Sequence, residues 1–319
     1  DIIWYFAPWN YRYLPSNFKK YKDWLSFLET KQVIATYHHI DVDKYDSGEY
    51  KPIFNFTNKY ADKYHVLCKS TYEFITKEEF YKNGYKKDII QLPLWINDQV
   101  FFNISSKDNL RNKYKFNQNE YLIGSFQKDT EGLKKWKCSK CLNVNKYDIN
   151  GKNYCSYCNE CKTNEKIIYT PKLSKGPDLF IKIILDMKLK YDNIAVVLTG
   201  LRREYLISEL KKNNINYYYF EMLSLNEINE LYNCLDLYLV TSRYEGGPRS
   251  IYEASITKTP IISTDVGVAS LILNKKSIFD KKDYLSYQLA KPDTEYAFNS
   301  INDLKKENHI IKFYKKVFS

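Results

Sequence analysis

The stretch that decides the fold runs from Leu235 to Ala254 and reads LDLYLVTSRYEGGPRSIYEA. The apolar run LDLYLV (235–240) predicts a buried strand, and Pro248 is suited to the first turn of a following helix. Gly246 and Gly247 therefore lie in a strand-to-helix turn, the place where parallel sheets bind ligands at the carboxyl ends of their strands. The free N–H groups at the start of such a helix favour a phosphate.

Two glutamates flank this turn. Glu245 directly precedes the glycines and can face the mouth of a cleft, whereas Glu253 lies about one and a half turns into the helix. Because carboxylates accept hydrogen bonds from paired hydroxyls, one glutamate is suited to a sugar and the other to a ribose. The spacing alone also allows a surface acid followed by an unrelated helix acid.

The rest of the chain repeats the alternation of apolar runs and amphipathic stretches, which predicts βα units and an α/β fold with mostly parallel sheets. Ser224 and Glu227 form a capping box at the start of one helix. The strands predicted from residue 121 onward are 121–126, 194–199, 217–221, 235–240, 260–263 and 277–280. Those predicted before it are 2–6, 32–37, 64–68 and 88–92.

This pattern divides the chain into two α/β domains. The first, residues 1–102, is thin and opens on a strand with no βα unit before it, so we expect this domain to be truncated at its start. The remaining parts are a polar connection at 103–120, a second domain at 121–290 with an insertion at 134–168, and a lysine-rich helical tail at 291–319.

The insertion contains five of the seven cysteines. Cys138 and Cys141 form one Cys-x2-Cys pair, and Cys155 and Cys158 form another thirteen residues later, a spacing that predicts a zinc ribbon. Cys161 forms a further Cys-x2-Cys pair with Cys158, so any one of the last three cysteines can be the spare. We favour the first four as ligands, with Cys161 as a substitute. Four thiolates leave no open position, so the Zn²⁺ is structural, with disulfides or free thiols as the alternative.

The formal net charge of +11 is compatible with nucleic acid, an anionic membrane face or a phosphorylated substrate, and equally with a solvated lysine-rich surface. The sequence contains no apolar run long enough for a transmembrane helix. We therefore expect a cytoplasmic protein whose basic face can attach it to an anionic surface. The clustered cysteines favour the same reducing compartment.

The stretch SRYEGGPRSIYEASITKTPIISTDVG (242–267) resembles the signature of retaining glycosyltransferases of family 4, which have the GT-B architecture. IGSFQKDTEG (123–132), PKLSKGPDLF (171–180) and LTGLRREYL (198–206) are similar to donor-side elements of one subgroup. The resemblance implies two Rossmann-like, doubly wound domains facing a cleft. The second domain, which carries the small zinc-ribbon insertion, would hold most of a nucleoside-diphosphate sugar.

The resemblance also implies roles for the residues around the turn. Glu245 would contact hydroxyls of the donor hexose, and the amides of Gly246 and Gly247 would lie beside it, followed by Pro248. Glu253 would hold the ribose.

The family's two cations for the donor diphosphate are only partly matched in this sequence. Lys175 of the KGPD stretch matches the lysine that neutralises the diphosphate. The usual partner arginine follows the first strand of the domain, but Ser125 stands near that place, and Lys128 is the nearest cation. Arg202, after LTG, is a candidate for the base or phosphate pocket, with a solvent-facing arginine at a helix start as the alternative interpretation.

In the first domain, ATYHHID (35–41) resembles the strand-end histidine motif of this family. A histidine there can donate to the sugar or stabilise developing phosphate charge. Adjacent side chains point to opposite faces if the strand continues, so we expect one histidine to reach the donor, with His39 favoured over His38. A packed, neutral histidine is the alternative for either.

The reaction implied is transfer of a sugar to an acceptor hydroxyl with retention of anomeric configuration, without an enzymic nucleophile. The donor region contains no Asp-x-Asp motif, so no catalytic divalent metal is expected. The acceptor, whether glycan, lipid-linked sugar or protein, is left open. The alternative function is a nucleic-acid- or protein-binding module, built on the zinc ribbon and an inactive GT-B scaffold. The intact Glu245, Glu253 and Lys175 argue against it.

Overall fold

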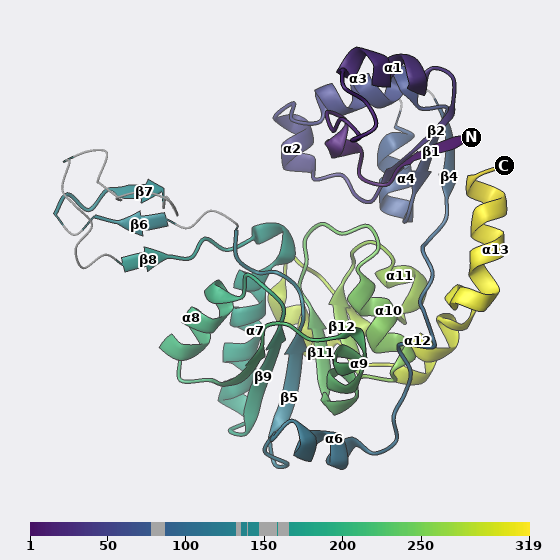
Figure 1. Ribbon diagram of the computed structural model, residues 1–319. Helices are drawn as coiled ribbons and strands as arrows, with labels where there is room; N and C mark the ends of the chain where they lie inside the picture. Colours follow the sequence, from purple (N-terminus) through teal and green to yellow (C-terminus); the bar gives the residue numbers. More distant parts are fainter. Residues whose placement is uncertain (78–86, 132–134, 139, 147–157, 159–165) are drawn as a thin grey trace.

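The computed structural model of residues 1–319 describes the chain except residues 78–86, 132–134, 139, 147–157 and 159–165 (Figure 1). Two α/β domains lie one above the other, and a three-stranded ribbon extends from the second of them (Figure 1). No helix in the described part of the chain combines the length and the apolarity needed to cross a bilayer.

The first domain contains a four-stranded parallel sheet in the order β1-β2-β3-β4. The strands are β1 (Ile2–Tyr5), β2 (Gln32–Tyr37), β3 (Lys63–Val66) and β4 (Asp88–Gln91). The helices are η1 (Pro8–Asn10), α1 (Tyr21–Leu28), α2 (Val42–Asp46), α3 (Lys51–Tyr60) and α4 (Lys69–Ile75). Trp24 and Leu28 of α1 and Phe54 of α3 pack with Ala35 and Tyr64 of the sheet, so the apolar faces of the helices bury one side of it.

The second domain contains a six-stranded parallel sheet in the order β10-β9-β5-β11-β12-β13. The strands are β5 (Tyr121–Ser125), β9 (Ile194–Thr199), β10 (Asn216–Phe220), β11 (Leu237–Val240), β12 (Ile261–Thr264) and β13 (Ile278–Phe279). The helices between and after them are η2 (Leu173–Lys175), α7 (Pro177–Lys190), α8 (Glu204–Lys212), α9 (Leu225–Cys234), α10 (Arg249–Ile256), α11 (Ala269–Ile272), η3 (Lys275–Ser277) and η4 (Tyr284–Leu289). The strand order reverses between β5 and β11, and ligands of doubly wound sheets bind at such a switch point.

The segment expected to be a plain connection, residues 103–120, contains α6 (Lys107–Lys113), and its apolar side chains belong to the second domain. Leu110 and Phe116 are buried in that domain's core, and Arg111 pairs with Asp236. The chain therefore crosses between the domains earlier, around Ile96, whose amide donates to the carbonyl of Leu304 over 2.8 Å.

The tail after residue 291 returns the chain to the first domain. It consists of α12 (Thr294–Ser300), η5 (Asn302–Leu304) and α13 (Lys306–Val317). Phe313 and Val317 of α13 are fully buried against Ile34 and Leu92 of the first sheet, whereas Ala297 of α12 is buried in the second domain. Figure 1 shows α13, in yellow, alongside the first domain. The tail thus ties the two domains together.

The insertion forms an antiparallel sheet in the order β7-β6-β8. Its strands are β6 (Lys135–Lys137), β7 (Val144–Lys146) and β8 (Lys166–Ile168). At its base, the amide of Glu131 donates to the carbonyl of Thr170 over 2.9 Å, and Thr130 pairs with Pro171. These contacts join the ribbon to the loop between β5 and α7.

Candidate active site

The turn after β11 lies where the two domains meet. A Cβ placed on Gly246 would overlap the backbone carbonyl of His38, so only glycine allows this approach of the first domain. Gly267 has φ +56°, and a Cβ there would overlap the carbonyl of Gly246 from the other side. The turn is therefore held between the β12–α11 connection and the first domain.

Lys175 and Glu245 form an ion pair at the switch point of the second sheet. Lys175 ends η2, in the connection between β5 and α7, and Glu245 lies in the turn after β11; their side chains are 23% and 11% exposed. Glu245 Oε1 also accepts a hydrogen bond from Ser242 Oγ over 3.3 Å. The structure thus brings together two residues that lie seventy positions apart and that the sequence assigned to the same ligand.

Arg243 fixes the turn that carries Lys175. Its guanidinium makes a bidentate contact with Asp178 (Nη1–Oδ1 2.8 Å, Nη2–Oδ2 2.7 Å) and donates to the carbonyl of Leu173 over 2.8 Å. The guanidinium lowers the pKa of the Asp178 carboxyl, which burial opposes. Because such pairs constrain geometry on both sides, Arg243 sets the position of the lysine turn relative to Glu245. Sequence reasoning missed this residue, although it stands two positions before Glu245.

Both histidines face the same region. β2 ends at Tyr37, so His38 and His39 lie beyond the strand and do not alternate between faces. Both line a cavity of about 230 Å³ together with Glu245, Gly246 and Gly247. Burial lowers the pKa of each histidine, while Glu245 raises both in part. The expectation that one of the pair reaches the site depended on a continuing strand, which the structure does not have.

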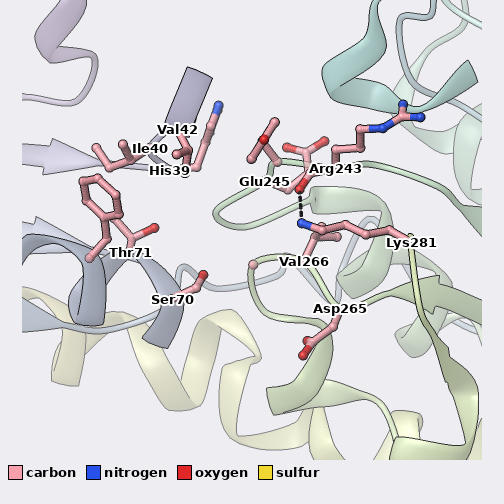
Figure 2. Close-up of a pocket in the computed structure, with 13 residues that line it drawn as sticks. His39, Ile40, Val42, Ser70, Thr71, Arg243, Glu245, Asp265, Val266 and Lys281 are labelled. Atoms are coloured by element: carbon pink, nitrogen blue, oxygen red, sulfur yellow. Dashed lines mark hydrogen bonds between the residues drawn. The ribbon is translucent and has the colours of Figure 1, made fainter. Parts of the chain in front are cut away.

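The two histidines differ in their contacts. His38 Nε2 lies 2.8 Å from the carbonyl oxygen of Phe6, so that nitrogen carries a proton and donates. His39 lines the cavity shown in Figure 2 as well, where residues of the first domain face Glu245 and Lys281 of the second. Lys281 Nζ donates to the carbonyl of Arg243 over 2.9 Å there.

Glu253 lies on α10 with its carboxylate against α9. Tyr232 donates a hydrogen bond to Glu253 Oε2 over 3.0 Å. Burial raises the pKa of Glu253, and Arg249 and Tyr232 lower it in part. The side chain is therefore held in one orientation at the side of the helix. Pro248 is the N-cap residue of α10, which begins at Arg249, one position later than the helix start expected from the sequence.

The cations expected near the diphosphate occupy different surroundings. Lys128 and Arg202 are exposed, and Arg202 has a left-handed backbone with φ +62° whose carbonyl accepts from the amides of Asp129 and Thr130 over 3.1 Å each. The buried arginine of this region is the next residue, Arg203, which the sequence reading did not select. Its Nε lies 2.7 Å from Asp129 Oδ2, with side chains 0% and 3% exposed.

Arg203 also reaches the end of β5. Its Nη2 donates to Ser125 Oγ over 3.3 Å, and its Nη1 contacts the carbonyl of Gln127. An arginine guanidinium thus lies near the position where the resemblance led one to expect an arginine, but it comes from the loop after β9. Burial lowers its pKa and Asp129 raises it. Nothing in the local sequence distinguished Arg203 from Arg202, because both precede the same helix.

The described cysteines of the ribbon form a candidate metal site. The Sγ atoms of Cys138, Cys141 and Cys158 all lie within 4.8 Å of one another, and those of Cys138 and Cys158 are 3.6 Å apart. Thiolates bound to one zinc at about 2.3 Å lie about 3.8 Å apart, so the three sulfurs fit a tetrahedral site. None of the described cysteines forms a disulfide. Cys155 and Cys161, the candidates for a fourth ligand, lie outside the described residues.

We expect the purified protein to contain one zinc per chain, as measured by plasma mass spectrometry after dialysis. Zinc binding in small ribbons contributes about 10–16 kcal/mol, enough to order a segment with few aliphatic residues. Cys138→Ser should release the metal and make the ribbon sensitive to proteolysis, while Cys68→Ser, at a buried cysteine of the first domain, should retain it. Full zinc occupancy in Cys138→Ser would contradict the site.

Comparison with known proteins identifies a domain and a fold. Residues 159–288 match the model of the family described as Glycosyl transferases group 1. No curated protein sequence matches the chain significantly. The fold resembles sucrose-phosphate synthase from Thermosynechococcus elongatus (TM-score 0.63, 12% identity, 90% of this chain and 68% of that one).

Two further solved structures are similar. Anabaena HepE in complex with UDP and glucose has a TM-score of 0.60 at 13% identity, over 91% of this chain and 73% of that one. TarM, known from S. aureus, has a TM-score of 0.61 at 15% identity, over 100% of this chain and 55% of that one. These likenesses, together with the parallel sheets, confirm the predicted α/β fold of the GT-B type.

Proposed function

We propose that the protein is a retaining glycosyltransferase of family 4 that moves a sugar from a nucleoside diphosphate to an acceptor hydroxyl. The observation that carries this proposal is the Lys175–Glu245 pair at the switch point, adjoining a cavity that His38 and His39 line from the other domain. The group 1 domain at 159–288 supports glycosyl transfer. The UDP and glucose bound by HepE support a nucleotide-sugar donor for a chain of this fold.

In this proposal the donor lies between the paired loops. Its diphosphate competes with Glu245 for the ammonium of Lys175, and Glu245 then accepts hydrogen bonds from hexose hydroxyls beside the amides of Gly246 and Gly247. Glu253 holds the ribose. The hydrogen bond from Tyr232 fixes the orientation of the Glu253 carboxylate, so the ribose would bind in one defined position. Lys128 and Arg202, both exposed, are the remaining candidates for the phosphates or the base.

Catalysis would come mainly from electrostatic stabilisation of the leaving diphosphate. The bond between the acceptor oxygen and the anomeric carbon forms as the bond between that carbon and the phosphate oxygen breaks, on the same face of the sugar. The acceptor proton passes to the leaving phosphate, so no enzymic nucleophile takes part. His39 donates to the sugar or the phosphate, and Arg243 keeps the Lys175 turn in position.

The test is turnover of a panel of radiolabelled nucleotide sugars, first in buffer and then with EDTA. We expect one donor to be hydrolysed or transferred at an unchanged rate in EDTA, with the product anomer, read from proton couplings by NMR, matching the donor. If EDTA stops the reaction, adding back zinc or manganese separately distinguishes a structural metal from a catalytic one. No turnover with any donor, or an inverted product, would contradict the proposal.

A further inference from the structure

A second, larger cavity lies beside the proposed donor site. It has a volume of about 380 Å³, within the range of small-ligand pockets, and the first domain supplies most of its wall. Its lining residues are Trp9, His39, Lys44, Glu49, Tyr50, Ile53 and, from the second domain, Lys172. Trp9 and His39 also line the cavity that contains Glu245, so the two cavities are neighbours on the two sides of these residues.

Trp9 presents an aromatic face at the junction of the two cavities. It is 47% exposed, and its indole N–H has no hydrogen-bond partner among the described residues. The indoles of Trp4 and Trp24, by contrast, donate to Thr36 over 2.7 Å and to Tyr5 over 3.1 Å. Trp9 follows the buried Pro8 and lies 5.8 Å from the ring of His38, so its position is defined although its face is free. An exposed, positioned indole is suited to stacking against a flat apolar surface.

The polar groups of the cavity carry charges of both signs, because Lys44 and Lys172 supply ammonium groups and Glu49 supplies a carboxylate. Tyr50 is fixed by stacking on Phe54, with ring centroids 5.7 Å apart, and its hydroxyl accepts from the amide of Asp41 over 3.3 Å. No residue in the described part of the chain accepts the phenolic hydrogen, so it can donate to a ligand. Lys44 and Glu49 form a loose, exposed pair at 3.9 Å, which offers donors and an acceptor side by side. Hydroxyl groups, which donate and accept at once, match this mixture better than a phosphate does.

We propose that this cavity binds the acceptor, and that the acceptor is a sugar whose ring stacks on Trp9. This inference rests on the proposed function, because it requires a donor held at Glu245. An apolar ring face on the indole and hydroxyls at Tyr50, Lys44 and Glu49 would direct one remaining hydroxyl past His39 toward the anomeric carbon. That hydroxyl oxygen forms the new glycosidic bond, and its proton leaves with the diphosphate.

The experiment measures transfer from the active donor to three kinds of acceptor. These are methyl glycosides of common hexoses and N-acetylhexosamines, glycerol 3-phosphate, and a serine- and threonine-containing peptide. We expect transfer to at least one glycoside, with Trp9→Ala raising its KM about tenfold or more and Trp9→Phe preserving most of the affinity. UDP affinity, measured by calorimetry, should change much less than this KM, because Lys175 and Glu253, the residues assigned to its diphosphate and ribose, lie in the second domain. Tyr13→Ala, at an exposed aromatic residue of the same segment that does not line this cavity, is the control.

The outcomes separate this inference from the proposed function. Donor hydrolysis without transfer to any glycoside, transfer to glycerol 3-phosphate or the peptide instead, or an unchanged KM in Trp9→Ala would each overturn the sugar acceptor while leaving donor turnover intact. If no donor turns over, glycoside binding by saturation-transfer NMR still tests the cavity. If the saturation-transfer signals of the glycoside persist in Trp9→Ala, the proposed stacking of a sugar on Trp9 is wrong.

Discussion

Replacing Lys175 with methionine is expected to lower kcat/KM for sugar transfer by about 10²–10³-fold, the typical effect of removing one group that stabilises developing charge. The ammonium is the cation that the structure holds directly against Glu245, and methionine keeps much of the side-chain length without its charge. The loss should fall on kcat as well as on UDP affinity, because the charge on the leaving diphosphate grows in the transition state. Initial rates over a range of donor concentrations, with calorimetric binding of UDP, check this.

The control for this prediction is Lys182→Met on the exposed face of α7, which removes the same charge from the same part of the domain. This variant should leave both kcat and UDP affinity within about twofold of the wild type, because solvent and salt screen an exposed charge from the donor site. Thermal unfolding should show that Lys175→Met is still folded even though Glu245 has lost its ion-pair partner. Equal losses in the two variants, or none in Lys175→Met, would show that net charge or another cation neutralises the donor.

The second domain was predictable because its signals are local. Each apolar run predicts one strand without reference to distant residues. The capping box at Ser224 forms as expected, with the Glu227 carboxylate accepting from the Ser224 amide over 2.7 Å. The strand-to-helix turn at Gly246 was also recognisable from its neighbours in sequence. Such features need no knowledge of distant residues, so periodicity and turn chemistry locate them.

The features that the sequence did not reveal depend on contacts between distant segments. The choice between Arg202 and Arg203 depends on which side chain pairs with Asp129, in the connection after β5, and the structure shows that it is Arg203. The docking of α13 on the first sheet depends on the buried Phe313, which in sequence belongs to an ordinary amphipathic stretch. The placement of both histidines on one side follows from the end of β2 at Tyr37, a boundary that propensity does not locate to a single residue.

The close contact between Gly246 and His38 gives the second large prediction. Gly246→Ala is expected to reduce kcat/KM at least about 100-fold, because the new Cβ would overlap the His38 carbonyl, a backbone group that cannot rotate away. The first domain would have to shift relative to Glu245, and displacements of about 1 Å at a reacting centre can cost 10²-fold. UDP affinity should change far less, since Lys175 and Glu253 both lie in the second domain.

Gly247→Ala is the matched comparison, with the same substitution at the adjacent position. A Cβ there would meet Leu67 Cδ1 at 3.1 Å, and this contact can be relieved by rotation of a flexible side chain. We therefore expect less than a tenfold loss in Gly247→Ala, with both variants unfolding cooperatively near the wild-type temperature. Equal activity in the two variants would show that the domains do not need the close approach at His38. Catalysis would then depend on the second domain and its ligands rather than on the approach of the first domain to the glycine turn.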